Sequence, residues 1–157
     1  MTTAIKWVKR PTIARNTSGF TRRQIMDALL ICGKRPSGSL LLDLTKTEGN
    51  TRGWCASVGD PGVVAVTWQY NGTHYAADCH IRLRVNTLEP NKYGLRVKRG
   101  MPKLVLTVTR WQALCLLLAH ELGHWRQAVR DRKVRCLQLD CDRASLRVAR
   151  KLGLVKP

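Results

Sequence analysis

The amino-acid sequence predicts an α+β domain in which a helix, a small antiparallel β-meander and two further helices follow one another. The meander is indicated by β-branched, aromatic and alternating residues between positions 63 and 108. The helices are indicated by capping boxes that stand directly before apolar residues with helical spacing. Because strands and helices occupy separate stretches of the chain, the order is typical of an α+β rather than an α/β architecture.

The prediction divides the chain into a basic N-terminal arm, residues 1–20, and a single domain, residues 21–157. The arm contains Lys and Arg residues together with Pro11 and Gly19, which favour irregular structure around one short strand near residues 5–8. It has no apolar h-region of a secretory signal, so we expect a cytoplasmic protein.

A first helix is expected to begin after Thr21, since Thr21 and Gln24 have the spacing of a capping box. Ile25 and Leu29 form an apolar stripe, and Gly33 is a natural stop. Residues 34–62 are rich in Gly, Ser, Pro, Asn and Thr. We expect them to form a loop with one short strand or helical turn at residues 40–44.

The meander should begin with a strand at residues 63–70, followed by the hairpin turn Asn71-Gly72. A single return strand is expected at residues 73–85, in which apolar residues alternate with Arg82 and Arg84. Further short strands are predicted at residues 95–98 and 103–108. The alternation places the arginines on one face, either as a solvated surface or as phosphate contacts.

A second helix is predicted at residues 110–130, where Thr109 and Gln112 form another capping box. A third helix is expected at residues 134–152, stopped by Gly153. The longest apolar stretch, residues 113–119, is far too short to span a bilayer, so no membrane partner is expected.

The charge of the chain is strongly basic. Twenty-eight Lys and Arg against ten acids give a net charge of +18 in 157 residues. Such an excess implies a polyanionic partner, DNA or another nucleic acid, with a solubilising surface as the alternative. The six cysteines do not form a tight C-x-x-C pair and are expected to be buried thiols.

The second predicted helix contains His120-Glu121-Leu122-Gly123-His124, which has the pattern H-E-x-x-H. Two histidines four residues apart lie on one face of a helix, where both imidazoles can bind one metal ion. Glu121 is then placed to act as a general base on a metal-activated water. A catalytic zinc takes three protein ligands, so a third ligand for Zn²⁺ must come from elsewhere.

The motif, with Asp140-Cys141-Asp142-Arg143 after it, resembles the zincin metallopeptidases over residues 103–152. The resemblance is closest to minimal intracellular members such as the SprT-like proteins and the ImmA/IrrE group, which includes phage-related enzymes. In several such families a later helix carries E-x-x-x-D, whose Glu binds zinc and whose Asp orients a ligand histidine. The resemblance implies that Asp142 is the orienting residue and that Gln138 stands at the ligand position.

Gln138 departs from that pattern, because a neutral amide is a poor zinc ligand beside a carboxylate. Gln138 and Asp142 share one face of the predicted third helix, whereas Asp140 points away from it. We therefore predict Asp142 as the third ligand, with Asp140 as the second choice and Gln138 as the third. If Asp142 binds the metal, the orienting group lies elsewhere or is missing.

Other candidate residues have weaker support. His80 could be a ligand or a transition-state donor, but a core or surface histidine is the expected role. Tyr75 and Tyr93 are candidates for stabilising an oxyanion, and Cys136 and Cys141 are expected to serve helix packing. A substrate strand is expected to pair with an edge strand at residues 81–85 or 103–108.

Two functions follow from the sequence. The first is a zinc metalloendopeptidase, a hydrolase that cleaves peptide bonds in proteins associated with nucleic acid. The alternative is a basic nucleic-acid-binding protein with a degenerate, non-catalytic zincin core. A metal-binding protein without catalysis is a third reading.

Overall fold

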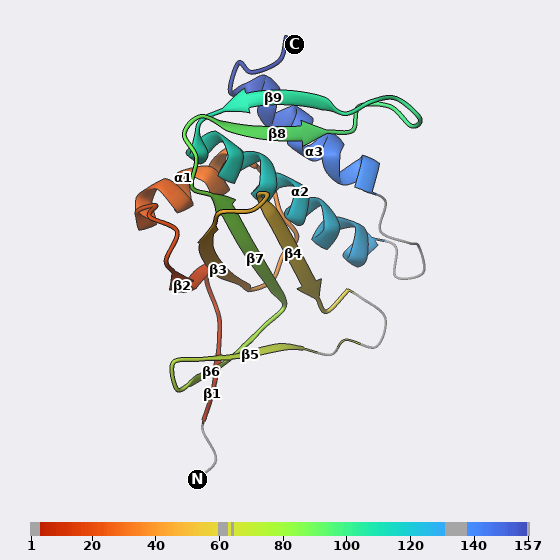
Figure 1. Ribbon diagram of the computed structural model, residues 1–157. Helices are drawn as coiled ribbons and strands as arrows, with labels where there is room; N and C mark the ends of the chain where they lie inside the picture. Colours follow the sequence, from red (N-terminus) through yellow and green to blue (C-terminus); the bar gives the residue numbers. More distant parts are fainter. Residues whose placement is uncertain (1–3, 60–62, 64, 131–137, 157) are drawn as a thin grey trace.

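Helix α2 (Arg110–Arg130) lies across one face of a four-stranded mixed sheet, with helices α1 (Arg22–Ile31) and α3 (Gln138–Lys151) packed against it (Figure 1). The computed structural model describes residues 4–59, 63, 65–130 and 138–156. The elements in order are β1 (Ile5–Trp7), β2 (Thr12–Asn16), α1 (Arg22–Ile31), β3 (Leu40–Thr47), β4 (Arg52–Ser57), β5 (Val66–Tyr70), β6 (Thr73–Ala77), β7 (Cys79–Asn86), β8 (Asn91–Leu95), β9 (Leu104–Val108), α2 (Arg110–Arg130) and α3 (Gln138–Lys151). The α+β class is confirmed.

The described strands form three sheets. The largest has the order β2-β3-β7-β4, a second has the order β1-β6-β5, and β8 pairs with β9. Strands β2, β3 and β7 are parallel, and β4 runs antiparallel to β7. The predicted antiparallel meander is therefore wrong, since only its β5–β6 and β8–β9 pairs are hairpins of neighbouring strands.

Strand β3 is the element that the sequence prediction missed most clearly. Leu40, Leu42 and Leu44 enter the core under the helices, while Leu41 is buried on the opposite face against Val8. A strand buried on both faces lacks alternation, so its apolar run looks like a short turn in a loop. Strand β4 was likewise missed in the same predicted loop.

The N-terminal residues are less irregular than predicted. Strand β1 pairs in parallel with β6 and matches the short strand expected near residues 5–8, while β2 pairs in parallel with β3. The prediction of irregular structure was wrong for β2, because its pairing partner is the unrecognised β3.

The predicted return strand of residues 73–85 is two strands in two sheets, β6 and β7. The break falls at Asp78, whose carboxylate accepts hydrogen bonds from the Ser39 backbone N–H at 2.7 Å and from the Ser39 hydroxyl at 3.2 Å. The turn before β6 is as predicted, since Asn71 has φ of 50° and Gly72 has φ of 79°.

The predicted helices are largely confirmed. Both capping boxes are present, at Thr21 with Gln24 and at Thr109 with Gln112. Helix α2 has the predicted bounds, and α3 begins at Gln138 in the described part of the chain. Five cysteines, Cys32, Cys55, Cys79, Cys115 and Cys141, are thiols rather than disulfides; Cys136 lies outside the described residues.

Strand β4 is an edge strand that lies over α2, whereas β7 is paired on both sides. The prediction that residues 81–85 form an edge was therefore wrong. Residues 104–108, in β9, do lie at an edge of their sheet. No helix in the described ranges is long and apolar enough to cross a membrane.

Candidate metal centre

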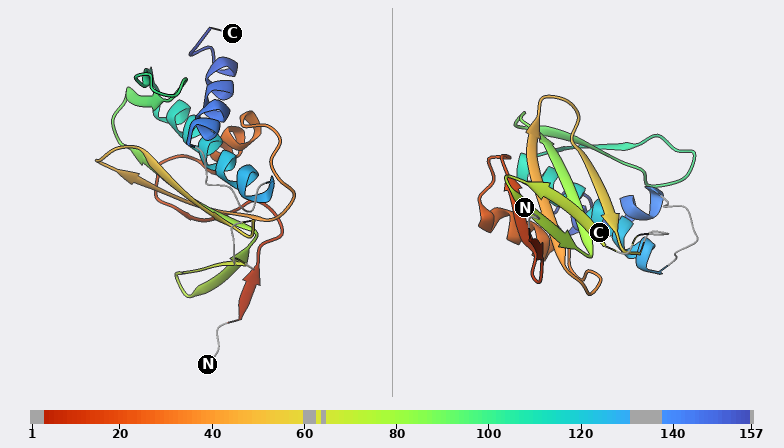
Figure 2. Two further views of the ribbon diagram at one scale, coloured as in Figure 1. Left: turned by 90° about the vertical axis from the view of Figure 1, so that its right-hand side faces the viewer. Right: turned by 90° about the horizontal axis from the view of Figure 1, so that it is seen from below.

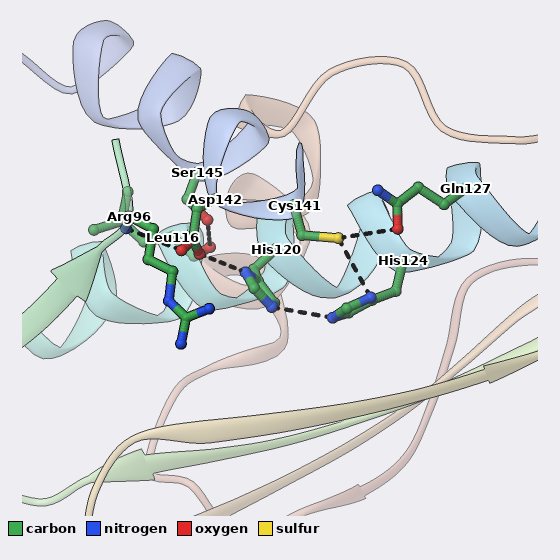
Figure 3. A network of polar contacts seen from close by, with 8 residues as sticks. All are labelled: Arg96, Leu116, His120, His124, Gln127, Cys141, Asp142 and Ser145. Carbon is green, nitrogen blue, oxygen red and sulfur yellow. Dashed lines mark hydrogen bonds and ion pairs between the residues drawn. The ribbon is translucent and has the colours of Figure 1, made fainter. Parts of the chain in front are cut away.

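The two histidines of the H-E-x-x-H motif lie one turn apart on α2 and face each other. Their Nε2 atoms are 3.1 Å apart, and the ring planes are nearly perpendicular at 78° (Figure 3). Two nitrogens that share one zinc at bonds of about 2.0–2.1 Å are about 3.3 Å apart at the tetrahedral angle. The spacing of the Nε2 atoms therefore fits a shared metal ion.

Asp142 of α3 holds the ring of His120 from the opposite edge. Its Oδ1 lies 2.8 Å from His120 Nδ1, and its Oδ2 accepts the backbone N–H of Arg96 at 2.9 Å. Both carboxylate oxygens are thus engaged, and the contact leaves His120 Nε2 directed at His124. In this arrangement Asp142 occupies the place of a group that orients a metal-binding histidine.

The environment of His120 acts on its pKa in two directions. Burial lowers the pKa, but the hydrogen bond that Asp142 accepts from the ring, the negative charges of Glu121 and Asp142, and the nearby Gln138 side chain outweigh burial and raise the pKa. Gln138 is thereby placed beside His120, one helical turn before Asp142.

Cys141, the residue before Asp142, contacts the other histidine. Its Sγ lies 3.3 Å from His124 Nδ1 and 3.6 Å from Gln127 Oε1 (Figure 3). His120, His124 and Cys141 form a group whose potential ligand atoms all lie within 4.8 Å of one another, so these residues could hold a metal ion. From the sequence, Cys141 was expected to serve helix packing alone. The available signal was its position next to Asp142, which lets one turn of α3 reach both histidines.

Gly123 explains how α3 comes so close to the motif helix. A Cβ atom on Gly123 would lie 3.0 Å from Cys141 Cα and 3.3 Å from Cys141 Sγ. Any larger residue would push α3 outward, and with it the two side chains that contact the histidine rings.

The two contacts of His124 cannot belong to the same metal ion, because its Nδ1 and Nε2 lie on opposite sides of the ring. The His120, His124 and Gln138 side chains border the cleft beside the motif, whereas Cys141 is fully buried behind it. A metal ion bound through both Nε2 atoms therefore has access from the cleft. Cys141 would be a ligand only if His124 bound the ion through Nδ1.

Glu121 is buried and points into the same cleft. Glu121 is 4% exposed. Burial raises the pKa of its carboxyl group to about 7, although the nearby His120 acts to lower it. A carboxyl group with a pKa near neutrality can both accept and return a proton at physiological pH. The backbone of Gly53 in β4 passes directly over this carboxyl group.

The cleft has a volume of about 1000 Å³ and lies between β4, the β8–β9 hairpin and α2. Four basic residues border it: Arg52, Lys92, Arg96 and Lys103. Glu121 and Asp142 are the acidic residues among the described lining residues. The cleft therefore carries mainly positive charge around its border, apart from Glu121 and Asp142 beside the two histidines.

The remaining predicted residues lie apart from this arrangement or at its border. Asp140 accepts a hydrogen bond from Arg143 at 3.1 Å and does not line the cleft. Tyr93 does line it, and burial raises the pKa of its hydroxyl. Tyr75 packs in a separate cluster, and His80 is buried against Trp54 and Trp68 on the far face of the sheet.

No family model, no curated protein and no solved structure matches the chain.

Proposed function

We propose that this protein is a zinc-dependent metallopeptidase of a minimal zincin-like type. The single observation that carries the proposal is that His120 and His124 turn their Nε2 atoms toward each other at 3.1 Å, beside the buried Glu121 and on a cleft. Zinc fits this set because imidazole nitrogens are its preferred neutral ligands and one side of the site is accessible to water.

His120 and His124 would hold the ion through Nε2. Gln138 would be the third ligand, since it also borders the cleft. Asp142 would keep His120 in the tautomer with its proton on Nδ1, and Cys141 would support His124 from behind. When bound, zinc would lower the pKa of water and polarise a peptide carbonyl. Because Gln138 is a neutral amide, we expect zinc to be held more weakly than by a carboxylate at that position.

The proton steps fall to Glu121. It accepts a proton from the attacking water, whose oxygen bonds to the peptide carbonyl carbon. It then delivers that proton to the amide nitrogen as the C–N bond breaks, which yields a carboxylic acid and an amine. The pKa of about 7 suits both halves of this cycle.

The substrate would bind as an extended segment along β4. Its outer edge, which pairs with no strand in the described part of the chain, lies beside the motif helix, so a peptide can add to the sheet as a further strand. The basic residues Lys92, Arg96 and Lys103 at the rim favour segments rich in Asp and Glu. The net charge of +18 directs the enzyme to proteins associated with nucleic acid in the cytoplasm.

The test compares Glu121→Gln with the natural chain for bound zinc and for cleavage of acidic and basic peptides. Loss of a general base slows such reactions by about 10²–10⁴-fold, and the variant should keep its zinc. Cleavage that persists in Glu121→Gln with unchanged metal content would show that the mechanism is wrong.

A second function is favoured by Gln138, since the position that would carry a zinc-binding carboxylate is neutral. In this alternative the protein binds nucleic acid and the zincin-like core is only a scaffold. Bound zinc, or none, with no cleavage of any peptide and intact nucleic-acid binding would support the alternative.

A further inference from the structure

A second surface lies on the face of the four-stranded sheet that points away from the helices (Figure 2, right, shows the strands in front of the helices). The strand registers place Arg15, Asp43, Arg82 and Trp54 in one row across β2, β3, β7 and β4. In the neighbouring row, Arg52 and Arg84 are direct partners. We call the four arginines together with Trp54 the arginine face.

The arginine face has far more positive than negative charge. Asp43 is buried and forms a bidentate ion pair with Arg15, with distances of 2.6 Å and 2.7 Å. Arg82 Nε lies 3.7 Å from Asp43 and makes no hydrogen bond within the described part of the chain. One carboxylate therefore serves two guanidinium groups, and Arg15 holds it more closely.

Arg52 and Arg84 are both exposed, and neither forms an ion pair with another described residue. Like charges at directly opposed positions of an antiparallel pair are destabilising. A bound polyanion relieves this repulsion, because guanidinium groups bind phosphates in bidentate geometry. The register thus concentrates an unbalanced charge that suits a row of phosphates.

Aromatic rings lie among these arginines. Arg82 sits 5.1 Å from the Trp54 ring centroid and 5.5 Å from that of Trp68, and Arg15 stands 5.4 Å from the latter. These cation–π contacts hold the guanidinium groups in place. Trp54 is 46% exposed at the edge of the sheet, so part of its ring is available to a ligand.

We propose that the arginine face binds single-stranded nucleic acid, with a base stacked on Trp54 and phosphates bound by Arg52, Arg82 and Arg84. Single strands fit better than a duplex because a duplex keeps its bases stacked on each other and away from an indole on a sheet surface. The inference goes beyond the peptidase proposal, since it uses none of His120, His124, Glu121, Gln138 and Asp142 and would hold for a protein that binds no zinc. Arg52 and Trp54 border the cleft, but the strand alternation points their side chains to the opposite face of the sheet.

The experiment measures binding of the full chain to a labelled single-stranded oligonucleotide and to the matching duplex over a range of salt concentrations. The test variant is Arg52→Ala with Arg84→Ala. The control is Arg22→Ala with Arg23→Ala, which removes the same charge from exposed positions on α1. We expect at least about tenfold weaker single-strand binding for the test pair, and a salt slope smaller by about 1.4, at about 0.7 for each lost phosphate contact.

Trp54→Ala should weaken single-strand binding by roughly 5- to 100-fold, while Trp54→Phe should retain most of it. Equal losses in the test and control pairs would overturn the proposal in favour of net charge. Preferred duplex binding, or an unchanged affinity of the folded Trp54→Ala variant, would also overturn it. Thermal unfolding of each variant checks the fold.

The peptidase proposal and the arginine-face proposal can be tested independently of each other. The arginine face predicts that nucleic-acid binding survives both Glu121→Gln and treatment with a zinc chelator. Peptidase activity lost in Glu121→Gln, alongside unchanged oligonucleotide binding, would support both proposals. Binding that vanishes with the chelator would place the nucleic acid at the metal centre and overturn the arginine face.

Discussion

Gly53 of β4 lies directly over the carboxyl group of Glu121. A Cβ atom at position 53 would lie 2.5 Å from Glu121 Oε1 and 2.8 Å from Cδ, so no side chain can stand there while Glu121 keeps its place. The edge strand β4 therefore covers the carboxyl group of the proposed catalytic base. Its closeness keeps Glu121 buried and raises its pKa to about 7.

Gly53→Ala should displace the Glu121 carboxyl group and reduce kcat for peptide cleavage by about 10- to 100-fold, because small misplacements of a reacting group are costly. Zinc content should be unchanged, since the three atoms nearest to the new Cβ all belong to Glu121 and not to a histidine. Steady-state kinetics with metal analysis measures both. Gly49→Ala is the matched control, because its new Cβ would meet only Thr47 Oγ1 at 3.5 Å. Equal activity in the two variants would contradict the role of Gly53.

Asp142→Asn should weaken zinc binding by about 10- to 100-fold, since groups that orient a ligand histidine typically contribute that much. The amide can still accept the N–H of Arg96, but it no longer fixes the proton on His120 Nδ1. Competition with a coloured chelator measures the affinity. Asp140→Asn is the control, as Asp140 contacts Arg143 instead. A loss in Asp140→Asn as large as in Asp142→Asn would assign the effect to general charge.

Gln138→Glu should tighten zinc binding by at least about tenfold and should increase peptide cleavage. Gln138 borders the cleft together with His120 and His124 and contributes to the raised pKa of His120, so a carboxylate at this position would lie on the cleft side of the motif. Carboxylates bind zinc far better than neutral amides.

The absorption spectrum of the cobalt-loaded protein decides whether Cys141 is a metal ligand. Cobalt bound to a thiolate gives a charge-transfer absorption band, and this band should be absent from both the natural chain and Cys141→Ser if the ion sits on the two Nε2 atoms. A band lost in Cys141→Ser, together with no effect of Gln138→Glu, would make Cys141 the third ligand in place of Gln138.

His80 should make the protein less stable in mild acid. Its burial, with Arg82 nearby, lowers its pKa from 6.5 to about 4 in the folded chain. Between these values the unfolded chain binds a proton that the folded chain does not. The contribution of the neutral His80 to the free energy of unfolding is therefore fully present above pH 6.5. It falls by about 2–3 kcal/mol as the pH drops to 4.

His80→Phe removes the titrating group from its place between Trp54 and Trp68. Urea unfolding at pH 7 and at pH 4.5 should show a smaller acid-induced loss for the variant than for the natural chain. His74→Phe is the control on β6, a histidine outside that aromatic pocket. Parallel losses for the natural chain and His80→Phe would show that His80 is not the source.

The predictable parts of this molecule were those with local signals. The capping box at Thr109 and the four-residue spacing of His120 and His124 require only one turn of helix, so sequence alone located α2 to the residue. The parallel pairing of β2 with β3 depends on residues far apart in the chain, and β3 has apolar side chains on both faces. Nothing local distinguishes such a strand from a buried turn.

The site divided in the same way. The sequence brought out Asp142 but predicted it as the third metal ligand, whereas its carboxylate contacts His120 Nδ1. The contacted edge of His120 depends on the distance between α2 and α3. That distance is set by Gly123 against Cys141, a contact between helices. The positions of Cys141 and of Gly53 over Glu121 likewise needed the folded chain.

The pairing of β4 with β7 determines which residues of β4 face the cleft and which belong to the arginine face. Successive residues of a strand point to opposite sides, so Gly53 faces the motif helix while Arg52 and Trp54 face the other way. A slip of one residue would aim an arginine or an indole at Glu121 and turn the glycine to solvent. An insertion or deletion in the turn before β4 would therefore disable the proposed catalysis and the proposed nucleic-acid binding in a single step, although every residue assigned to them would still be present.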